Sequence, residues 1–351
     1  MLSGLAESRG DGSAAQRVSP SCRRNTSLSP SKQKRAPYAP MPRSNPMAGI
    51  GLKVVSVTVF LSMASLLKAS EGIPPGQLVF FRSFFAILPI VVFLVARGEF
   101  IAGLKTERVL GHVGRGLVGV CGMGLAFFAL TRLPLPEMVA IQYAMPLLIV
   151  VFGALILKED VRLYRWSAVV VGMIGVGIIL WPRLGVFSGS SGPMNALAVG
   201  ALAALLSSVV GAFATILVRN LVQTERSATV VLYFSITCSV VALVTLPFGW
   251  VWPTPAQAAM LVGAGIAGGI GQILLTESYR HADVSVVAPF EYTSLLLSIV
   301  IGYFVFADVP TLEMLIGAVI VVGAGIFIIY REHRLGIETR KAREATPSPP
   351  G

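Results

Sequence analysis

Three ionisable side chains lie well inside apolar segments of this sequence: Arg82, Arg115 and Glu291. With a helical rise of about 1.5 Å per residue, each sits roughly 9–10 Å from the nearer end of its segment. A charge in hydrocarbon costs at least ~2.5–3.5 kcal/mol on insertion scales, so such a residue generally faces a partner or a polar cavity. Because Arg115 and Glu291 have similar depths, we predict that they pair. A carboxylate shielded from water can also exchange a proton near neutral pH, which makes Glu291 a candidate for proton coupling.

Glu291 belongs to a segment that occurs twice. The stretches around Tyr143 and Tyr292 read almost alike and lie 149 residues apart (292 minus 143). In this register Gln142 is the counterpart of Glu291. Two polar side chains related by a repeat are expected on opposite faces of one pathway. The tyrosine rings can stack on a flat ligand, although aromatic residues in apolar segments more often pack within the protein.

Other polar residues complete the candidate set. Gln272 lies deep in a later segment and offers a neutral hydrogen-bonding group, whereas Lys53 and Lys68 lie close enough to segment ends for their ammonium groups to reach water. His112 is expected near an interface, and Gln142 is expected near Arg82. The residues predicted to contact a ligand are Arg82, Arg115, Gln142, Tyr143, Gln272, Glu291 and Tyr292. The alternative for the charged members is a structural pair that locks helices together.

The composition is that of an integral membrane protein, with 54% hydrophobic and 13% charged residues. Average soluble proteins carry about 25% charged residues. Most apolar segments reach the ~20 residues that a helix needs to cross a bilayer. We predict an all-α protein with ten transmembrane helices, at 48–68, 75–96, 109–130, 136–157, 164–182, 195–218, 228–247, 257–279, 284–306 and 311–330.

The distribution of charge predicts the orientation of these helices. Most Lys and Arg residues lie in the two tails and in alternate loops, whereas the opposite loops hold only Arg132 and Arg183. By the positive-inside rule, both termini are cytoplasmic, in a bacterial inner membrane. This topology accounts for the net charge of +11 without a nucleic-acid partner. Each repeat makes five crossings, an odd number, so the two copies are predicted to be inverted. Such folds hold a ligand near the midplane and expose it alternately to each side.

Four regions follow from this pattern. They are a basic N-terminal tail (1–46), a first repeat (48–182), a second repeat (195–330) and a basic cytoplasmic C-terminal tail (331–351). The N-terminal tail is rich in Ser, Pro and Arg and is predicted to be disordered. As an alternative, translation starts at Met41 or Met47 and the tail is not native.

No catalytic, metal or cofactor constellation is visible in the sequence. Cys22, Cys121 and Cys238 have no paired spacing, and the three histidines lack an acid and a nucleophile at recognisable spacing. Residues 114–119 and 263–268 match G-x-G-x-x-G, but that motif binds a dinucleotide only between a strand and a helix. Inside a membrane helix, we predict that these glycines allow close helix packing. An enzyme is therefore not expected.

Taken together, these features resemble a known group of membrane proteins. The ten-helix repeat, FFRSFFAILP (80–89) and LPLPEMVAIQYAMPLL (133–148) with its second copy look like the drug/metabolite transporter superfamily, of the EamA type with two EamA domains. The run 271–310 and the YREHRLG end (330–336) resemble its bacterial riboflavin-importer branch. The resemblance covers 48–330 and implies a secondary transporter of a small metabolite, with riboflavin uptake favoured.

Alternatives stay open at this point. The superfamily also includes exporters of amino acids and drugs and carriers of S-adenosylmethionine, so another metabolite is an alternative substrate. A non-transporting membrane scaffold or enzyme is the alternative from a different class. The expected partners are a small molecule and the lipid bilayer, and the sequence does not indicate an oligomeric state.

Overall fold

The computed structural model describes residues 45–158, 161–184, 196–221, 224–282 and 284–345. Within these ranges every regular element is helical, as predicted. The tail predicted to be disordered, 1–46, lies almost entirely outside the described residues. The helices are α1 (Pro46–Ala69), α2 (Pro75–Ala96), α3 (Phe100–Leu104), α4 (Val109–Leu130), α5 (Leu135–Gln142), α6 (Ala144–Ile156), α7 (Leu163–Leu184), α8 (Ala196–Leu221), α9 (Ser227–Leu243), α10 (Pro255–His281), α11 (Val284–Val287), α12 (Thr293–Phe306) and α13 (Leu312–Ala345), with 3-10 turns η1 (Leu246–Phe248) and η2 (Ala288–Tyr292).

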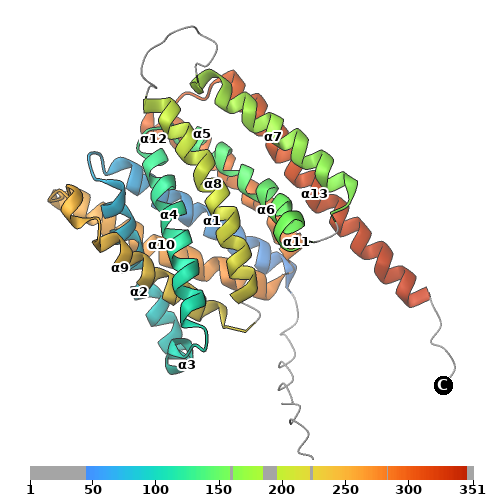
Figure 1. Ribbon diagram of the computed structural model, residues 1–351, viewed down its shortest axis with the longest axis horizontal. Helices are drawn as coiled ribbons and strands as arrows, with labels where there is room; N and C mark the ends of the chain where they lie inside the picture. Colours follow the sequence, from blue (N-terminus) through green and yellow to red (C-terminus); the bar gives the residue numbers. More distant parts are fainter. Residues whose placement is uncertain (1–44, 159–160, 185–195, 222–223, 283, 346–351) are drawn as a thin grey trace, which may run out of the picture. The chain divides into compact units, whose positions relative to one another are not determined.

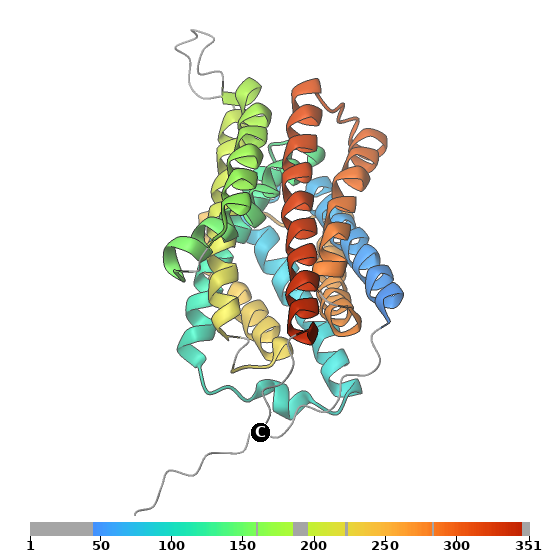
Figure 2. The same ribbon diagram turned by 90° about the vertical axis from the view of Figure 1, so that its right-hand side faces the viewer.

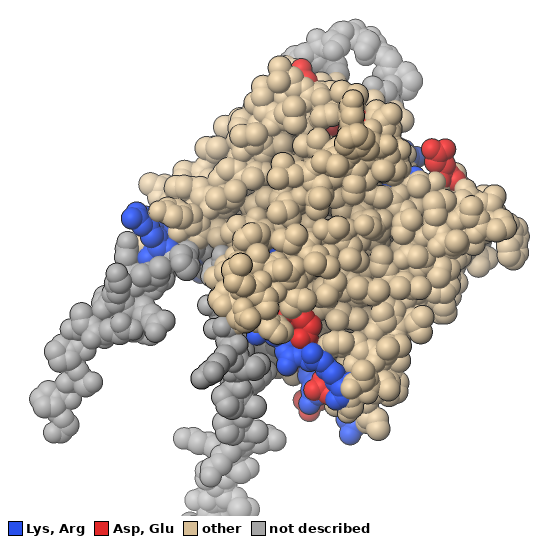
Figure 3. Space-filling view, turned by 180° about the vertical axis from the view of Figure 1, so that it is seen from behind, with Lys and Arg blue, Asp and Glu red and all other residues tan. Residues whose placement is uncertain are grey.

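The helices form a membrane-spanning bundle. Nine segments of the described chain are long and apolar enough to cross a bilayer, with α5 joined to α6 and η2 joined to α12. The remaining apolar segment, α9, has 17 residues and ends at Leu243 because a turn containing Pro247 follows. On the face shown in Figure 3, charged side chains gather near the edges and leave a broad uncharged band, which suits contact with lipid. The predicted ten-helix membrane class is confirmed.

Contacts between helices come in matching sets. Helix α1 packs against α10, and their counterparts in the other half, α8 and α4, pack against each other. Likewise the contact of α2 with α10 is matched by that of α9 with α4. Helices α2 and α7 each pack against their own counterparts, α9 and α13, and α7 lies beside α13 in Figure 1. The fold therefore consists of two inverted five-helix repeats that interleave, so the helices of each half contact those of the other.

Two membrane segments are broken at positions related by the repeat. Helix α5 ends at Gln142, since Pro146 cannot donate a hydrogen bond to the Gln142 carbonyl and its ring crowds that oxygen. In the other half, η2 contains Pro289 and separates α11 from α12. The membrane segments predicted at 136–157 and 284–306 are present, but the breaks within them were not predicted. Broken membrane helices free backbone polar groups where a bundle lines a cavity or a binding site.

Two glycines of the fingerprint matches, Gly116 and Gly265, bring helices into close contact, as predicted for this kind of motif in a membrane helix. A Cβ atom at Gly265 of α10 would lie 2.4 Å from the Cβ of Phe85 and 2.7 Å from the carbonyl oxygen of Phe81, both on α2. A Cβ atom at Gly116 of α4, 149 residues earlier (265 minus 116), would lie 2.5 Å from Cγ2 of Thr237 on α9. Only a residue without a side chain fits at either contact.

Helix α13 continues beyond the last membrane segment. It runs from Leu312 to Ala345, whereas the membrane-spanning part ends near Arg331. Residues 331–345 of the predicted C-terminal tail therefore extend the helix, which is the red ribbon facing the viewer in Figure 2.

Candidate functional site

Two arginines from the first half and polar residues from the second half line one small cavity. The cavity has a volume of about 100 Å³ and lies among α2, α4, α8, α9 and α10. Its polar lining consists of Arg82 from α2, Arg115 from α4, Ser235 from α9 and Gln272 from α10. Three of the seven residues predicted to contact a ligand therefore converge here. We refer to this site as the arginine cavity.

Among the residues that the structure describes, the two arginines have no negative partner. The guanidinium of Arg115 lies 3.7 Å from the centre of the Phe234 ring, and its Nε and Nη1 atoms are buried without a hydrogen bond. In the described part of the chain, neither Arg82 nor Arg115 forms an ion pair with a carboxylate. The hydroxyl of Ser235 is also buried without a hydrogen bond. Buried polar groups in this state are costly unless a ligand or water satisfies them.

Glycines related by the repeat make room for both guanidinium groups. A Cβ atom at Gly119 would lie 2.5 Å from Nη1 of Arg115. A Cβ atom at Gly268, 149 residues later (268 minus 119), would lie 3.3 Å from Nε of Arg82. Each half thus supplies one glycine beside one arginine, although both arginines belong to the first half.

The carboxylate of Glu291 lies in a different cluster. It forms an ion pair with Lys53 of α1, whose side chain is 2% exposed, while that of Glu291 is 51% exposed. The predicted pair between Arg115 and Glu291 is therefore wrong. Similar depth in the membrane did not make them neighbours, because η2 packs against α1. The expectation that Lys53 reaches water at the membrane surface is also wrong.

Tyr143 and Tyr292 pack against each other at the two helix breaks. Their ring centres are 4.9 Å apart with an angle of 49° between the planes. The Tyr143 hydroxyl donates a hydrogen bond of 3.1 Å to the backbone carbonyl of Glu291 and also bonds to Ser294. These contacts join the two broken segments, one from each half. Gln142, at the end of α5, is absent from the lining of the arginine cavity, so the structure does not place it with Arg82 there.

Ion pairs also join helices at the end of the bundle opposite Lys53. Lys68 of α1 donates to Asp308 at 2.8 Å and to the Leu133 carbonyl at 2.8 Å, and Asp308 accepts from the Leu135 backbone N–H at 3.0 Å. Lys68 is 15% exposed and was expected to extend into water, so that expectation was wrong. We did not predict from the sequence that either lysine forms an ion pair, although the sequence contains a pattern that indicates it. Two lysines on one segment match two acids, Glu291 and Asp308, at similar spacing on another.

His112 also departs from its expected place. It was expected at an interface, yet its side chain is 1% exposed and stacks on Tyr233 with ring centres 4.8 Å apart. Its Nε2 lies 3.9 Å from a carboxylate oxygen of Glu225, in the loop before α9. This cluster lies outside the arginine cavity and has no visible part in ligand contact.

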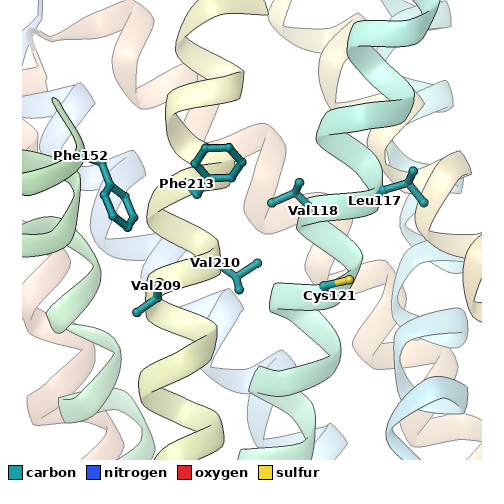
Figure 4. A pocket seen from close by; sticks show the side chains of 7 residues that line it. All are labelled: Leu117, Val118, Cys121, Phe152, Val209, Val210 and Phe213. Carbon is teal, nitrogen blue, oxygen red and sulfur yellow. The ribbon is translucent and has the colours of Figure 1, made fainter. Parts of the chain in front are cut away.

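A larger crevice elsewhere on the bundle is wholly apolar. It has a volume of about 490 Å³ and lies between α4, α6 and α8, as Figure 4 shows. Its lining residues are Leu117, Val118, Cys121, Phe152, Val209, Val210 and Phe213. With no charged or hydrogen-bonding group in its lining apart from a thiol, it suits hydrocarbon and not a polar solute. The chemistry that can select a polar ligand lies in the arginine cavity.

An all-helical membrane bundle of two inverted repeats with a polar cavity between them is an architecture of secondary transporters. The EamA-like transporter family matches the sequence twice, over residues 47–181 and 198–331. The chain therefore belongs to this family, within the drug/metabolite transporter superfamily, and it is a multi-pass membrane transporter.

Similar proteins move different solutes. The chain is 29% identical over 258 residues to the S-adenosylmethionine uptake transporter of Rickettsia prowazekii (strain Madrid E), covering 74% of this chain and 84% of that protein. It is 30% identical over 285 residues to the pseudopaline exporter CntI of Pseudomonas aeruginosa (strain UCBPP-PA14), covering 80% and 95%. It is 28% identical over 298 residues to the riboflavin transporter of Vibrio cholerae serotype O1, covering 84% and 93%. A solved crystal structure covering 82% of this chain and 99% of its own, with 21% identity and a TM-score of 0.58, shares the fold.

Proposed function

We propose that the protein carries a small polar metabolite across a bacterial inner membrane by alternating access, with the arginine cavity as its solute site. The observation that supports this most is that the cavity takes polar side chains from both inverted halves, Arg82 and Arg115 from one and Ser235 and Gln272 from the other. A site at such a junction changes its exposure when the halves move relative to each other. The halves are taken as 48–182 and 195–330.

We further propose that both termini are cytoplasmic. The support is the concentration of Lys and Arg in the tails and alternate loops. The test is to join a reporter that is active only outside the cytoplasm to residue 351 and, separately, to the loop that follows Arg183. Activity in the loop fusion alone supports the orientation, and activity in the C-terminal fusion alone overturns it.

The substrate proposal weighs two solutes. Riboflavin is favoured by the resemblance at 271–310 and by relatives at 27–28% identity. The site favours a solute that carries a carboxylate, such as S-adenosylmethionine, because neutral riboflavin offers no charge to Arg82 and Arg115. The two tyrosines that could stack on a flat ligand pack against each other. We therefore place the carboxylate-bearing solute first and riboflavin second.

Uptake by purified protein in liposomes tests the proposal. Protein-containing and protein-free vesicles are compared for accumulation of labelled S-adenosylmethionine and labelled riboflavin. Growth of a riboflavin-synthesis mutant on micromolar vitamin, with and without this gene, tests the second solute in cells. If the protein moves neither of these nor any of a panel of amino acids, a non-transporting role replaces the proposal.

We also propose Glu291 as a proton-coupling group. Its side chain is half exposed, and not shielded from water as the sequence suggested, so a proton can reach it; its only ion-pair partner in the described residues is Lys53. Transport should then fall when a protonophore collapses the gradient, and Glu291→Gln should lose that sensitivity. Equal transport with and without the gradient in the unchanged protein would rule this role out.

A further inference from the structure

Arg82 and Arg115 differ from the other basic side chains that join helices in this bundle. Lys53, Lys68 and Arg183 each pair with a carboxylate, and their side chains are 2%, 15% and 21% exposed. The two cavity arginines have no such partner among the described residues. The other cations that join helices each have a carboxylate partner. We therefore expect a negative group from outside the protein to neutralise the charges of Arg82 and Arg115.

The surroundings of both guanidinium groups are built to keep them in place. Gly119 and Gly268 leave the room that each group occupies, and the ring of Phe234 covers one face of Arg115. A planar guanidinium offers a fork of N–H donors that matches the oxygens of a carboxylate or phosphate. Nε and Nη1 of Arg115 are both buried without a hydrogen bond, so donors are available to an incoming group.

We propose that Arg82 and Arg115 together bind an oxyanion, a carboxylate or a phosphate, of the transported solute. This inference rests on the proposed transport function. Ser235 of α9 and Gln272 of α10, which also line the cavity, bind polar atoms next to the anion. A volume of about 100 Å³ accommodates the anionic end of a metabolite and not a whole nucleoside, so the rest of the solute extends out of the cavity.

Matched solutes test the charge requirement. The four probes are S-adenosylmethionine and 5′-methylthioadenosine, which lacks the carboxylate-bearing part, and riboflavin 5′-phosphate and riboflavin, which lacks the phosphate. The expected result in liposomes is uptake of the carboxylate- or phosphate-bearing member of one pair at least about tenfold faster than its partner without that group. The pair that shows the difference identifies the oxyanion. Equal or faster uptake of both neutral members overturns the proposal.

Matched arginine variants test the residues. Arg82→Gln and Arg115→Gln should each reduce uptake of the preferred anion at least about tenfold, mainly through a higher KM. Arg132→Gln is the control, because Arg132 also lies over a phenylalanine ring, 3.6 Å from Phe128, but near the end of α4. Uptake unchanged in both cavity variants overturns the proposal.

Stability separates solute binding from a structural role. An arginine that holds helices together would lower the unfolding temperature when replaced, whereas removal of an unpaired buried charge should leave it unchanged or raise it. Lower unfolding temperatures in both Arg82→Gln and Arg115→Gln, by several degrees, contradict the proposal. Thermal stabilisation by the carboxylate- or phosphate-bearing probe that the protein prefers should be present in the unchanged protein and absent in both variants. If vesicles move none of the probes, transport fails as the function, and lack of this stabilisation then also overturns the anion site.

Discussion

Replacing Lys53 or Glu291, which form an ion pair, should lower the stability of the protein by unequal amounts, because the two side chains differ in exposure. The Lys53 side chain is 2% exposed and that of Glu291 is 51% exposed. Removal of one partner from a buried pair leaves the other charge unpaired and costs about 3–5 kcal/mol. In Glu291→Gln the remaining charge is the buried ammonium. We expect the free energy of unfolding to fall by about 3 kcal/mol. This value is at the lower end of the range for buried pairs, because the pair is partly open to water.

The opposite replacement should cost much less. In Lys53→Met the remaining charge is a half-exposed carboxylate, and methionine fills much of the space of the lysine stem. We expect a loss below about 1 kcal/mol, similar to that of an exposed pair. The double variant should then resemble Lys53→Met alone, since neither charge remains, and should regain about 2 kcal/mol relative to Glu291→Gln.

Reversible unfolding in mixed micelles, followed by tryptophan fluorescence and circular dichroism, measures these differences. Arg97→Gln serves as a control, because Arg97 pairs with Glu277 across helices and is 36% exposed. Its cost should stay below about 1 kcal/mol. The reasoning is refuted if Lys53→Met destabilises as much as Glu291→Gln, or if the double variant is no more stable than Glu291→Gln.

Three further predictions concern stability. Gly265→Ala should lower the free energy of unfolding by about 1–3 kcal/mol through overpacking against α2. Gly263→Ala should not lower it, because the nearest atom to the added Cβ would be 3.6 Å away. Equal thermal unfolding of the two variants would contradict this prediction. Asp308→Asn should weaken its bond to Lys68 and lower the free energy of unfolding by about 2 kcal/mol, measured in micelles. Burial acts to raise the pKa of Glu225, but hydrogen bonds from a threonine hydroxyl and a backbone N–H outweigh it and place the pKa below 4.5. The advantage of the unchanged protein over Glu225→Gln should therefore be full above pH 4.5 and disappear as the pH falls through the lowered pKa; an advantage independent of pH would count against it.

The membrane crossings were predictable because length and apolar composition determine them directly. The predicted segments at 75–96 and 109–130 have the same bounds as α2 and α4. The inverted arrangement followed from an odd number of crossings in each repeat, and contacts between matching helices agree with it. The breaks were missed, even though Pro146 and Pro289 in the repeated segments were a visible warning.

The site was only partly predictable from the sequence. The depth of a residue in the membrane gives its position along one direction only, and it does not determine which side chains are in contact. Arg115 and Glu291 lie at similar depths, but the helix beside η2 is α1, which carries Lys53. The convergence of Arg82, Arg115 and Gln272 also depends on which way each helix faces, and a single sequence does not state this. The polar side chains inside apolar segments pointed to Arg82, Arg115 and Gln272 individually, but not to the cavity that they share.

Helix α1 is attached to the ninth membrane segment at two heights. Lys53 and Lys68 are 15 residues apart (68 minus 53), which corresponds to about 22 Å along a helix. If α1 tilts so that Lys68 separates from Asp308, the helix stays attached through the ion pair of Lys53 with Glu291. If it tilts the other way, the helix stays attached through the ion pair of Lys68 with Asp308. Loss of either ion pair alone leaves α1 attached through the other, and detachment at both heights requires the loss of two ion pairs. If the protein works by alternating access, as proposed, two separate electrostatic attachments on a single helix would then disfavour simultaneous opening at both ends.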